Sequence, residues 1–300
     1  MTPFFSIIIP TYNRAYILPE TIKSIQNQLF KDWEILIIDD GSSDNTKEVI
    51  ENISKNLSQI KYFYQINSER SVARNYGASL AQGKYLLFLD SDDFFKEEHL
   101  QNIYKEIINK ENPIGLFFTN ILYCTNNGIE KPNIPIMEIG KEFKYMLLNP
   151  ITPSRVCIHR DIFNEFKFDP EIVIVEDLVL WVCIATKYPV FQVDYYSLCY
   201  RVHDGNSVDL SRNSYLSRYK GLKRLFAHGK YKNVSTLIPN NIKNFLLAEC
   251  SFNMARHFEF NKNNKMMIQM LIQSFFYKFN YRNKERIYMI YNNYLLKNLK

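Results

Sequence analysis

Short apolar runs alternate with helical patterns through the first hundred residues, and this alternation limits the fold more than any other feature. The runs are typical of buried strands, and between them apolar side chains recur with helical spacing. The order strand, helix, strand requires crossover connections, which place helices on both faces of a parallel sheet. The sequence therefore predicts an α/β fold with a mostly parallel central sheet. The predicted strands are Phe4–Pro10, Trp33–Asp39, Ile60–Ile66 and Lys84–Asp90, and the predicted helices are Leu18–Gln28, Ser42–Ile53, Val72–Ala81 and Glu97–Asn109.

The rest of the chain divides into an irregular stretch and a helical one. Prolines interrupt residues 111–170, where no regular pattern is evident. We expect an α/β domain at residues 1–210, followed by a helical region at residues 211–300. The helices predicted in that region are Tyr215–Phe226, Asn241–Phe258, Lys265–Phe279 and Lys284–Leu299.

Charge is distributed unevenly between these two regions. Residues 1–210 hold 20 Lys/Arg and 28 Asp/Glu, whereas residues 211–300 hold 17 Lys/Arg and 3 Asp/Glu. This asymmetry indicates that the two regions face different partners. The basic, aromatic-rich tail fits either a solvated helical subdomain or an amphipathic surface on an anionic membrane. No recognition motif for nucleic acid accompanies the charge, so we predict no nucleic-acid partner.

Cysteine usage and hydropathy bear on the compartment. The five cysteines include no Cys-x-x-Cys pair, which favours reduced thiols in a cytosol over a disulfide framework or a zinc site. The first apolar run ends at Pro10, too early for a secretory signal. No apolar stretch reaches the roughly 18 residues of a membrane span. We therefore expect a cytoplasmic protein, attached at most peripherally to the inner face of the cell membrane.

The stretch YLLFLDSDD (Tyr85–Asp93) ends a predicted buried strand with three carboxylates in four positions. Two carboxylates about 5 Å apart repel by about 3 kcal/mol at an effective dielectric of 20. The three are therefore tolerable when they are solvated, protonated or beside a cation. One interpretation is a clamp for a divalent metal and a diphosphate, because Mg²⁺ and Mn²⁺ bind carboxylate oxygens together with phosphates. The other is that Asp92 or Asp93 caps the next helix, and both can hold on different residues.

Two more polar positions fall near the predicted carboxyl edge of the sheet, where ligands bind in such folds. Asp40 follows the second strand and is suited to accept from a base N–H or a ribose hydroxyl, or else it belongs to a capping turn with Ser43 or Asp44. Arg74 begins a helix that leads to the acidic strand. It would meet an anion or hold Asp90, unless it is an ordinary surface arginine.

Two motifs in the second part of the α/β region also carry ionisable groups. Glu176 and Asp177 lie inside the apolar run EIVIVEDLVLWVCIA. Burial raises a carboxylate pKa, which suits a general base, whereas the alternative is favourable placement at a helix N-terminus. His203 ends YRVH (Tyr200–His203) and would be a metal ligand only if it faces the aspartate cluster.

Taken in series, these motifs resemble glycosyltransferase family 2, whose members have the GT-A fold. The resemblance implies an inverting, metal-dependent hexosyl transfer from a nucleoside-diphosphate sugar, usually a UDP-sugar, with Mn²⁺ or Mg²⁺ as cofactor. It implies a saccharide or lipid-linked saccharide acceptor in surface glycan biosynthesis. The matching segments, spread over about residues 4–205, are Ser6–Arg14, Ile37–Asp44, Ala73–Gly77, Tyr85–Asp93, Glu176–Asp177 and Tyr200–His203.

The resemblance also assigns roles to single residues. Asp177 would be the catalytic base, with Glu176 beside it, and Asp92 of the DXD motif would bind the metal with His203. One departure concerns Asn67–Ser71, which lacks the Gly that many members carry before Ala-Arg-Asn, so we expect the backbone to approach the donor differently there. The residues that would bind the nucleotide are Pro10, Thr11, Tyr12, Asp40, Asn67, Arg74, Asp90 and Ser91.

Two rival functions stay open on the sequence. A sugar-nucleotide pyrophosphorylase also binds nucleotides beside acidic metal sites, but PTYNRAY (Pro10–Tyr16) lacks the Gly-rich phosphate loop expected near its N-terminus. A non-catalytic nucleotide-sugar-binding protein of the same fold would not need intact Asp92 and Asp177. The aromatic C-terminal helices also offer a contact for a homodimer.

Overall fold

The computed structural model describes residues 2–55, 57–203, 214–227 and 229–291, which form two compact units. Unit 1 comprises Met1–Pro170 and Glu176–His203, and unit 2 comprises Glu171–Val175 and Asp204–Lys300. The domain boundary predicted at residue 210 lies outside the described residues. Each unit is considered below on its own.

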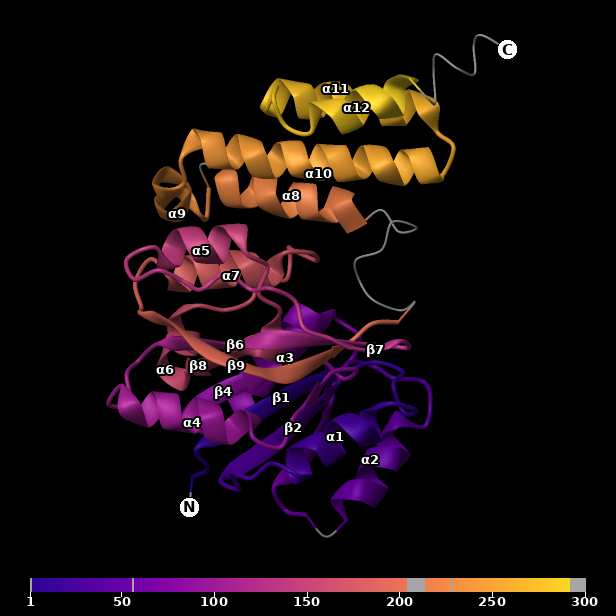
Figure 1. The fold of residues 1–300 in the computed structure, drawn as a ribbon. Coiled ribbons are helices and arrows are strands. Elements are labelled where there is room, and N and C mark those ends of the chain that lie inside the picture. The colour runs from indigo at the N-terminus through magenta and orange to yellow at the C-terminus, as the bar shows by residue number, and fades with distance from the viewer. Residues whose placement is uncertain (1, 56, 204–213, 228, 292–300) are drawn as a thin grey trace. The chain divides into compact units, whose positions relative to one another are not determined.

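The first half of the unit 1 sheet is parallel, as predicted (Figure 1). Its strands run side by side in the order β3-β2-β1-β4, and each predicted strand is confirmed with ends that agree to within two residues. The carboxyl ends of these strands therefore meet at one edge of the sheet. The strands are β1 (Phe5–Thr11), β2 (Trp33–Asp39), β3 (Ile60–Tyr64) and β4 (Tyr85–Phe88).

Helices cover both faces of this parallel half, because alternate strand residues point to opposite sides. On one face, Ile7, Ile9, Ile35 and Ile37 share a core cluster with residues of α1, α2 and α4. On the other face, α3 comes so close that a Cβ on Gly77 would lie 2.5 Å from Cγ2 of Ile8. The helices are α1 (Leu18–Gln26), α2 (Thr46–Ser54), α3 (Arg70–Leu80) and α4 (His99–Asn109).

Helix α1 ends earlier than its apolar spacing suggested. The predicted helix continued to Gln28, but the chain leaves helical conformation after Gln26, and the backbone N–H of Leu29 donates instead to the carbonyl of Glu97 at 2.8 Å. The amide of Gln28 is used in the same way, since its Nε2 donates to the carbonyl of Lys96 at 2.8 Å. Contacts with a distant segment therefore override the local helical pattern at this end.

Three strands of the second half of the sheet, β6, β7 and β8, come from residues 111–170, which the sequence left irregular, and β5 and β9 flank that stretch. β8 is antiparallel to β4 and β6, while β9 runs parallel to β6 and antiparallel to β5. The predicted α/β class holds, and the mixed second half completes a sheet that has nine strands within the described residues. Its strands are β5 (Phe94–Phe95), β6 (Leu116–Thr125), β7 (Gly128–Glu130), β8 (Val156–His159) and β9 (Val190–Arg201), and its helices are α5 (Glu142–Leu148), the 3-10 turn η1 (Pro153–Arg155), α6 (Arg160–Glu165) and α7 (Glu176–Ile184).

Unit 2 is helical as predicted, with α10 packed against both α8 and α11 (Figure 1). The short helix α9 was not predicted, and the predicted helix Lys284–Leu299 is described only as far as Tyr291. Among the described residues no helix has both the length and the apolar character needed to cross a membrane. The helices are α8 (Ser214–Phe226), α9 (Lys232–Leu237), α10 (Asn240–Phe260), α11 (Asn264–Tyr277) and α12 (Asn283–Ile290).

Candidate functional site at the carboxyl edge of the sheet

The carboxyl ends of β2, β1 and β4 bring three of the predicted site residues to one edge. The backbone N–H of Asp40 donates to the carbonyl of Thr11 at 2.8 Å, so the end of β2 is paired with the end of β1. On the other side, the N–H of Leu89 donates to the carbonyl of Ile8 at 2.9 Å, and Asp90 follows directly. Because neighbouring strands lie about 4.8 Å apart, the backbones of Asp40 and Asp90 flank β1 within about 10 Å.

Asp40 is a buried carboxylate whose orientation is fixed by its neighbours. Its Oδ1 accepts from Nε2 of Gln65 at 2.7 Å and from the backbone N–H of Ser68 at 2.8 Å. Both of these hydrogen bonds use Oδ1, and neither engages Oδ2. Asn67, exposed, lies beside this carboxylate, because a Cβ on Gly41 would be only 2.8 Å from its backbone N. Gly41 also has φ of +86°, so a glycine is required on both counts.

The loop after β1 is tied to the loop after β2 through Asn13. Asn13 Oδ1 accepts from the backbone N–H of Ser43 at 2.8 Å, and its own N–H donates to Oγ of Ser42 at 2.8 Å. The Asp44 carboxylate accepts from the N–H of Ala15 at 3.2 Å. Burial opposes ionisation of Asp44, but hydrogen bonds from Thr46 and Ala15 lower its pKa overall. Sequence reasoning did not single out Asn13, although it lies within the quoted PTYNR motif.

The three residues predicted to line the nucleotide pocket on β1 differ in exposure. Pro10 is half-buried, Thr11 is buried and the side chain of Tyr12 is half exposed. Oγ1 of Thr11 has no hydrogen-bond partner within the described part of the chain. An unsatisfied buried hydroxyl is costly, so this atom is suited to a ligand group that completes its bonding.

Arg74 joins the acidic strand end to the start of α7. Its side chain is buried, and Nη2 donates to Oδ1 of Asp90 at 2.6 Å while Nη1 donates to Oε1 of Glu176 at 2.9 Å. Burial alone lowers the pKa of Arg74, but the two carboxylates raise it above its ordinary value. The predicted contact between Arg74 and Asp90 is present. The contact with Glu176, 102 residues away in the sequence, was not foreseen.

Glu176 and Asp177 occupy different environments at the start of α7. Glu176 is buried, with Arg74 and, at 3.9 Å, Nε of Arg70 beside it. Asp177 is half-buried, and its Oδ1 accepts from the backbone N–H of Leu178 at 2.7 Å. Both acids also lie in the first turn of the helix, so the helix-terminus interpretation holds alongside any other. Glu176 is held in an ion pair, and Asp177 is the more accessible of the two acids.

Asp92 lies close to a histidine and an arginine side chain. Its Oδ2 lies 3.0 Å from Nε2 of His203 and 3.6 Å from Nη2 of Arg14. His203 therefore faces the aspartate cluster, which was the condition set for its role as a ligand. Asp92 is partly exposed, so this oxygen can also be reached from solvent.

Asp93 has a different task from Asp90 and Asp92. It is buried, its Oδ2 accepts from Oγ of Ser154 at 2.7 Å and its Oδ1 accepts from the backbone N–H of Arg201 at 3.2 Å. Burial, with the nearby Asp90 and Asp92, raises the pKa of Asp93 well above its ordinary value. The three crowded carboxylates are thus tolerated in three ways: beside an arginine, beside a histidine and partly exposed, or buried with ionisation disfavoured.

The turn that carries these acids is fixed from several sides. Oγ1 of Thr21 on α1 donates to the carbonyls of Ser91 and Asp93 at 2.9 Å each. Nε of Arg201 donates to the carbonyl of Asp92 at 3.1 Å. The backbone N–H of Asp90 donates to Oγ of Ser154 at 3.1 Å. Sequence reasoning missed Ser154 and Arg201, and only the position of Arg201 inside YRVH gave a signal.

The residues present fit a divalent metal that is completed by a substrate. Among the described residues, no group of three or more His, Cys, Asp or Glu side chains is arranged to hold an ion by itself. Mg²⁺ and Mn²⁺ sites in phosphate-handling proteins commonly use one or two protein ligands, with phosphate oxygens and water at the other positions. Asp92 and His203 supply a carboxylate oxygen and an imidazole nitrogen 3.0 Å apart, which meets that requirement.

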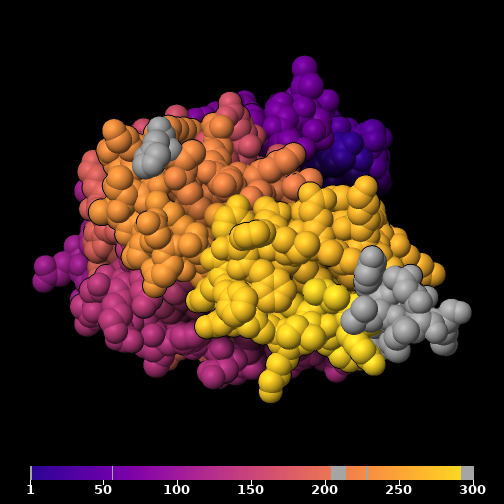
Figure 2. Space-filling view, turned by 90° about the horizontal axis from the view of Figure 1, so that it is seen from above, coloured from indigo at the N-terminus to yellow at the C-terminus, as the bar shows by residue number. Residues whose placement is uncertain are grey.

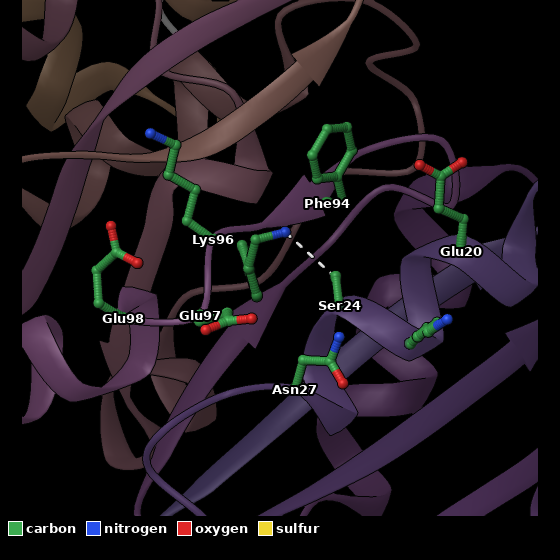
Figure 3. A pocket seen from close by; sticks show the side chains of 9 residues that line it. Glu20, Ser24, Asn27, Phe94, Lys96, Glu97 and Glu98 are labelled. Atoms are coloured by element: carbon green, nitrogen blue, oxygen red, sulfur yellow. Dashed lines mark hydrogen bonds between the residues drawn. The ribbon is translucent and has the colours of Figure 1, made fainter.

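A separate hollow of about 460 Å³ lies between α1 and the segment that joins β5 to α4 (Figure 3). The N–H of Phe95 donates to Oγ of Ser24 at 3.2 Å across it. None of the predicted site residues lines this hollow, so it is distinct from the acidic edge. Its lining residues are Glu20, Lys23, Ser24, Asn27, Phe94, Phe95, Lys96, Glu97 and Glu98.

The fold and the acidic edge together define a protein of the GT-A type. The structure resembles that of S. aureus TarS 1-349 in complex with UDP-GlcNAc, with a TM-score of 0.59 and 21% sequence identity over 96% of this chain and 86% of that chain. A second crystal structure of S. aureus TarS 1-349 gives a TM-score of 0.58, and the match covers 91% of this chain and 80% of that chain. The GT-A fold expected from the sequence is thereby confirmed.

The family follows from the sequence comparison. Residues 6–167 match the family described as glycosyl transferase family 2. This chain belongs to glycosyltransferase family 2, as its motifs suggested.

Curated relatives carry glycosyltransferase names. The glycosyltransferase TuaG of Bacillus subtilis, assigned to teichuronic acid biosynthesis, is 38% identical over 187 residues, which are 62% of this chain and 73% of that protein. The GalNAc(5)-diNAcBac-PP-undecaprenol beta-1,3-glucosyltransferase of Campylobacter jejuni is 47% identical over 93 residues, 30% of each chain. An uncharacterized glycosyltransferase of Rickettsia conorii is 35% identical over 213 residues, 70% of this chain and 35% of its own length. The chain thus spans only about a third of the last two relatives.

Proposed function

We propose that this chain is an inverting, metal-dependent glycosyltransferase that moves a sugar from a UDP-sugar to a saccharide or lipid-linked saccharide acceptor. The observation that carries the proposal is the gathering of Asp40, Asp90, Asp92 and Glu176–Asp177 around the carboxyl ends of β1, β2 and β4. Strand pairing and the Arg74 ion pairs join these groups in one region. Acids far apart on the surface would be unable to contact a single donor and a single acceptor at the same time.

The nucleotide would lie across the end of β1. Oδ2 of Asp40, which the bonds to Oδ1 do not use, would accept from a uracil N–H, and Oγ1 of Thr11 is a buried hydroxyl in need of a partner. Asp90 would hold the ribose side, with its other oxygen fixed by Arg74. In this arrangement the carboxylates select the uncharged part of the donor by hydrogen bonds.

The diphosphate would lie at Asp92. Asp92 and His203 would hold Mn²⁺ or Mg²⁺, which when bound supplies charge neutralisation to the departing diphosphate. Arg201 keeps the Asp92 carbonyl in place, and Thr21 keeps the neighbouring carbonyls in place, so the carboxylate is preorganised. Burial and the neighbouring acids raise the pKa of Asp93, so its charged form is less favourable than that of an ordinary carboxylate.

Asp177 is the candidate base for the acceptor. It takes the proton of the acceptor hydroxyl as that oxygen forms its bond to the anomeric carbon. The bond between the anomeric carbon and the diphosphate oxygen breaks on the opposite side, and the nucleoside diphosphate leaves with that electron pair. One displacement inverts the anomer, so a UDP-α-sugar would give a β-linkage. Glu176 positions Arg74 and thereby Asp90.

The similar proteins support the substrate classes in this proposal. The solved structure of TarS contains UDP-GlcNAc, which favours a UDP-sugar donor. The Campylobacter relative is named for an undecaprenol-linked acceptor, and TuaG for a cell-surface polymer. Both names favour an acceptor in surface glycan biosynthesis.

The proposal is tested with Asp177→Asn. We expect this variant to bind UDP with Mn²⁺ as the parent chain does, measured by the thermal shift that ligand binding produces, but to lose about a thousandfold in transfer rate. Asp161→Asn, on an exposed carboxylate of α6, is the matched control and should transfer normally. Full activity in Asp177→Asn would show that another group takes the proton. No stabilisation of the parent chain by any UDP-sugar would contradict the donor class.

A further inference from the structure

Helix α11 presents large apolar side chains to solvent on its outer side. Ile272 and Phe276 lie one turn apart on α11 and are 49% and 87% exposed. Phe279, 72% exposed, follows the end of the helix, with its ring 6.0 Å from that of Phe275. We call Ile272, Phe276 and Phe279 the outer patch. Exposed Phe side chains in a cluster are unusual on a soluble surface and mark contact sites.

The opposite side of α11 is fixed in place, so the helix cannot rotate to hide the outer patch. Met267, Leu271 and Ser274 are fully buried in the core of unit 2, and Oγ of Ser274 donates to the carbonyl of Ala248 on α10 at 2.7 Å. Arg286 of α12 is also fully buried, and Nη2 donates to the carbonyl of Ser274 at 2.9 Å. Rotation would expose these groups, so the outer patch stays outside.

Arg286 extends this fixation to the segment that holds Phe279. Its Nη1 donates to the carbonyls of Lys278 and Phe279 at 3.0 and 3.1 Å. The guanidinium also lies over the ring of Phe275, 4.4 Å from its centroid. Phe279 is therefore presented by an ordered turn rather than by a free chain end.

The segment that carries the outer patch is rich in positive charge. Residues 260–291 contain six Lys/Arg and a single acid, Glu285. Glu285 is already paired with Arg282 at 2.8 Å, whereas the side chains of Lys262, Lys265 and Lys278 are exposed. Figure 2 shows residues of α11 and α12, in yellow, at the surface of unit 2. The partner of this face is therefore expected to carry negative charge.

A second copy of the chain is disfavoured by the same charges. Pairing two such faces would place cations opposite cations, which costs energy at short range. A lipid bilayer with anionic headgroups instead offers negative charge at its surface and an apolar layer just beneath it. Aromatic side chains enter that layer to about 5–10 Å, while flanking lysines keep their charges in the headgroup region.

We infer that the outer patch and its flanking lysines form a docking surface for an anionic lipid bilayer. Phe276 and Phe279 insert between headgroups, and Lys265 and Lys278 bind the anionic groups around them. The inference goes beyond the proposed transfer reaction, because it requires neither donor nor metal. It would bring the chain to the surface where a lipid-linked acceptor is found.

The experiment uses the full chain and sedimentation with two kinds of vesicle, one of phosphatidylcholine and one containing roughly a third phosphatidylglycerol. We expect binding to be at least about tenfold tighter on the anionic vesicles, since each Lys near the surface contributes to attraction. Phe276→Ser/Phe279→Ser should weaken binding to anionic vesicles by about tenfold or more, because two apolar insertions are lost. Raised salt should weaken binding of the parent chain as well.

Matched controls distinguish binding by the outer patch from nonspecific hydrophobic adsorption to vesicles and from misfolding of the variant. Ile136→Ser/Ile139→Ser removes two apolar side chains of unit 1 that are 77% and 97% exposed, and it should bind anionic vesicles like the parent. Far-UV circular dichroism should be unchanged in both double variants. Equal binding to neutral vesicles, or equal binding by the Phe variant, overturns the inference. The inference is also overturned if the parent chain forms a dimer and binds no vesicles, and the Phe276→Ser/Phe279→Ser variant is a monomer. That result would identify a second copy of the chain as the partner of the outer patch.

Loss of vesicle binding and loss of enzyme activity are separate outcomes. A chain that binds anionic vesicles but shows no stabilisation by UDP-sugars leaves this surface intact and contradicts only the proposed function. A chain that is stabilised by a UDP-sugar but ignores anionic vesicles contradicts only this surface. Each result therefore bears on one of the two claims.

Discussion

Each of the two units buries an arginine completely, and the two arginines are treated differently. Arg74 in unit 1 lies between Asp90 and Glu176, and those carboxylates raise its pKa against the effect of burial. Arg286 in unit 2 donates to Ser274 and to backbone carbonyls, and burial lowers its pKa. The first arginine pairs with two carboxylates, whereas the second closes the end of a helix with neutral partners.

The contrast extends to the surfaces of the two units. Unit 1 gathers its acids at one sheet edge and compensates them with Arg74, Arg14 and His203. Unit 2 leaves Lys262, Lys265 and Lys278 exposed on the segment that carries exposed apolar side chains. A buried charge needs a built partner, because desolvation is costly. An exposed charge needs none, so it is free to meet an external one.

The largest expected effect concerns the acidic edge. Asp92→Asn removes the charge that His203 and Arg14 face, and we expect transfer to fall by at least about a thousandfold, or about 4 kcal/mol of transition-state stabilisation. Binding of Mn²⁺ in the presence of UDP, followed by the signal of free Mn²⁺ in electron paramagnetic resonance, should weaken in parallel. Stability should change little, because Asp92 is partly exposed.

Asp32→Asn serves as the control for that variant, since Asp32 is an exposed acid in the loop before β2. It should keep both activity and Mn²⁺ binding. An Asp92→Asn variant that retains full metal-dependent transfer would remove the clamp from the proposal.

The next effect compares the two buried arginines directly. Arg74→Met leaves Glu176 buried without its partner, and we expect unit 1 to lose about 3 kcal/mol of unfolding free energy. Arg286→Met leaves neutral carbonyls unsatisfied, for which about 1–2 kcal/mol is expected. Both tryptophans of the chain, Trp33 and Trp181, belong to unit 1, so their fluorescence reports Arg74→Met. Far-UV circular dichroism, dominated by helices, reports Arg286→Met.

A double variant decides whether the unpaired carboxylate causes the loss. Arg74→Met/Glu176→Gln removes the stranded charge and should recover part of the stability lost in Arg74→Met. If the double variant is less stable than the single one, the cost lies in packing around Phe168, whose ring centroid is 5.2 Å from the Arg74 guanidinium, rather than in charge.

The smallest effect concerns the pH dependence of unit 1. His99 is buried against Phe95 with Nδ1 2.9 Å from Oγ of Ser197, and burial lowers its pKa to about 3. In the unfolded chain the pKa is about 6.5, so below that pH the unfolded state binds the extra proton. The neutral form therefore stabilises the fold above about pH 6.5, and this contribution is lost as pH falls towards 3.

Between pH 7 and pH 5 the loss from His99 should be about 2 kcal/mol. His99→Gln should remove that part of the slope when unfolding is followed by tryptophan fluorescence in denaturant. His159→Gln is the comparison, because burial lowers the pKa of His159 as well, but that residue is less deeply enclosed. A slope that is the same in His99→Gln and the parent would show that His99 is protonated within the fold.

Much of the parallel half of unit 1 was predictable because its signals are local. The strand runs and helical spacings lie within segments of about ten residues, and the acids Asp90, Asp92 and Asp93 follow directly on one such run. The contact of Arg74 with Asp90 was also within reach, since only 16 residues separate them. The assignments of single residues to donor, metal and acceptor remain predictions.

The second half of the sheet was not predictable in the same way. β8 pairs with β4 on one side and with β6 on the other, across long separations and through a stretch interrupted by prolines. No local pattern connects Ser154 to Asp93 or Arg201 to Asp92. These contacts depend on which strands become neighbours, and that is settled by packing rather than by periodicity.

The amino-acid sequence alone determined the alternation of strands and helices, the acidic strand end and the basic tail. Each of these features depends only on residues that are close together in the sequence. Only tertiary structure decided that Glu176 would meet Arg74, that His203 would face Asp92 and that Phe276 would stay exposed. Those outcomes depend on packing between distant segments, where the cost of burying a charge or an apolar ring is paid or avoided.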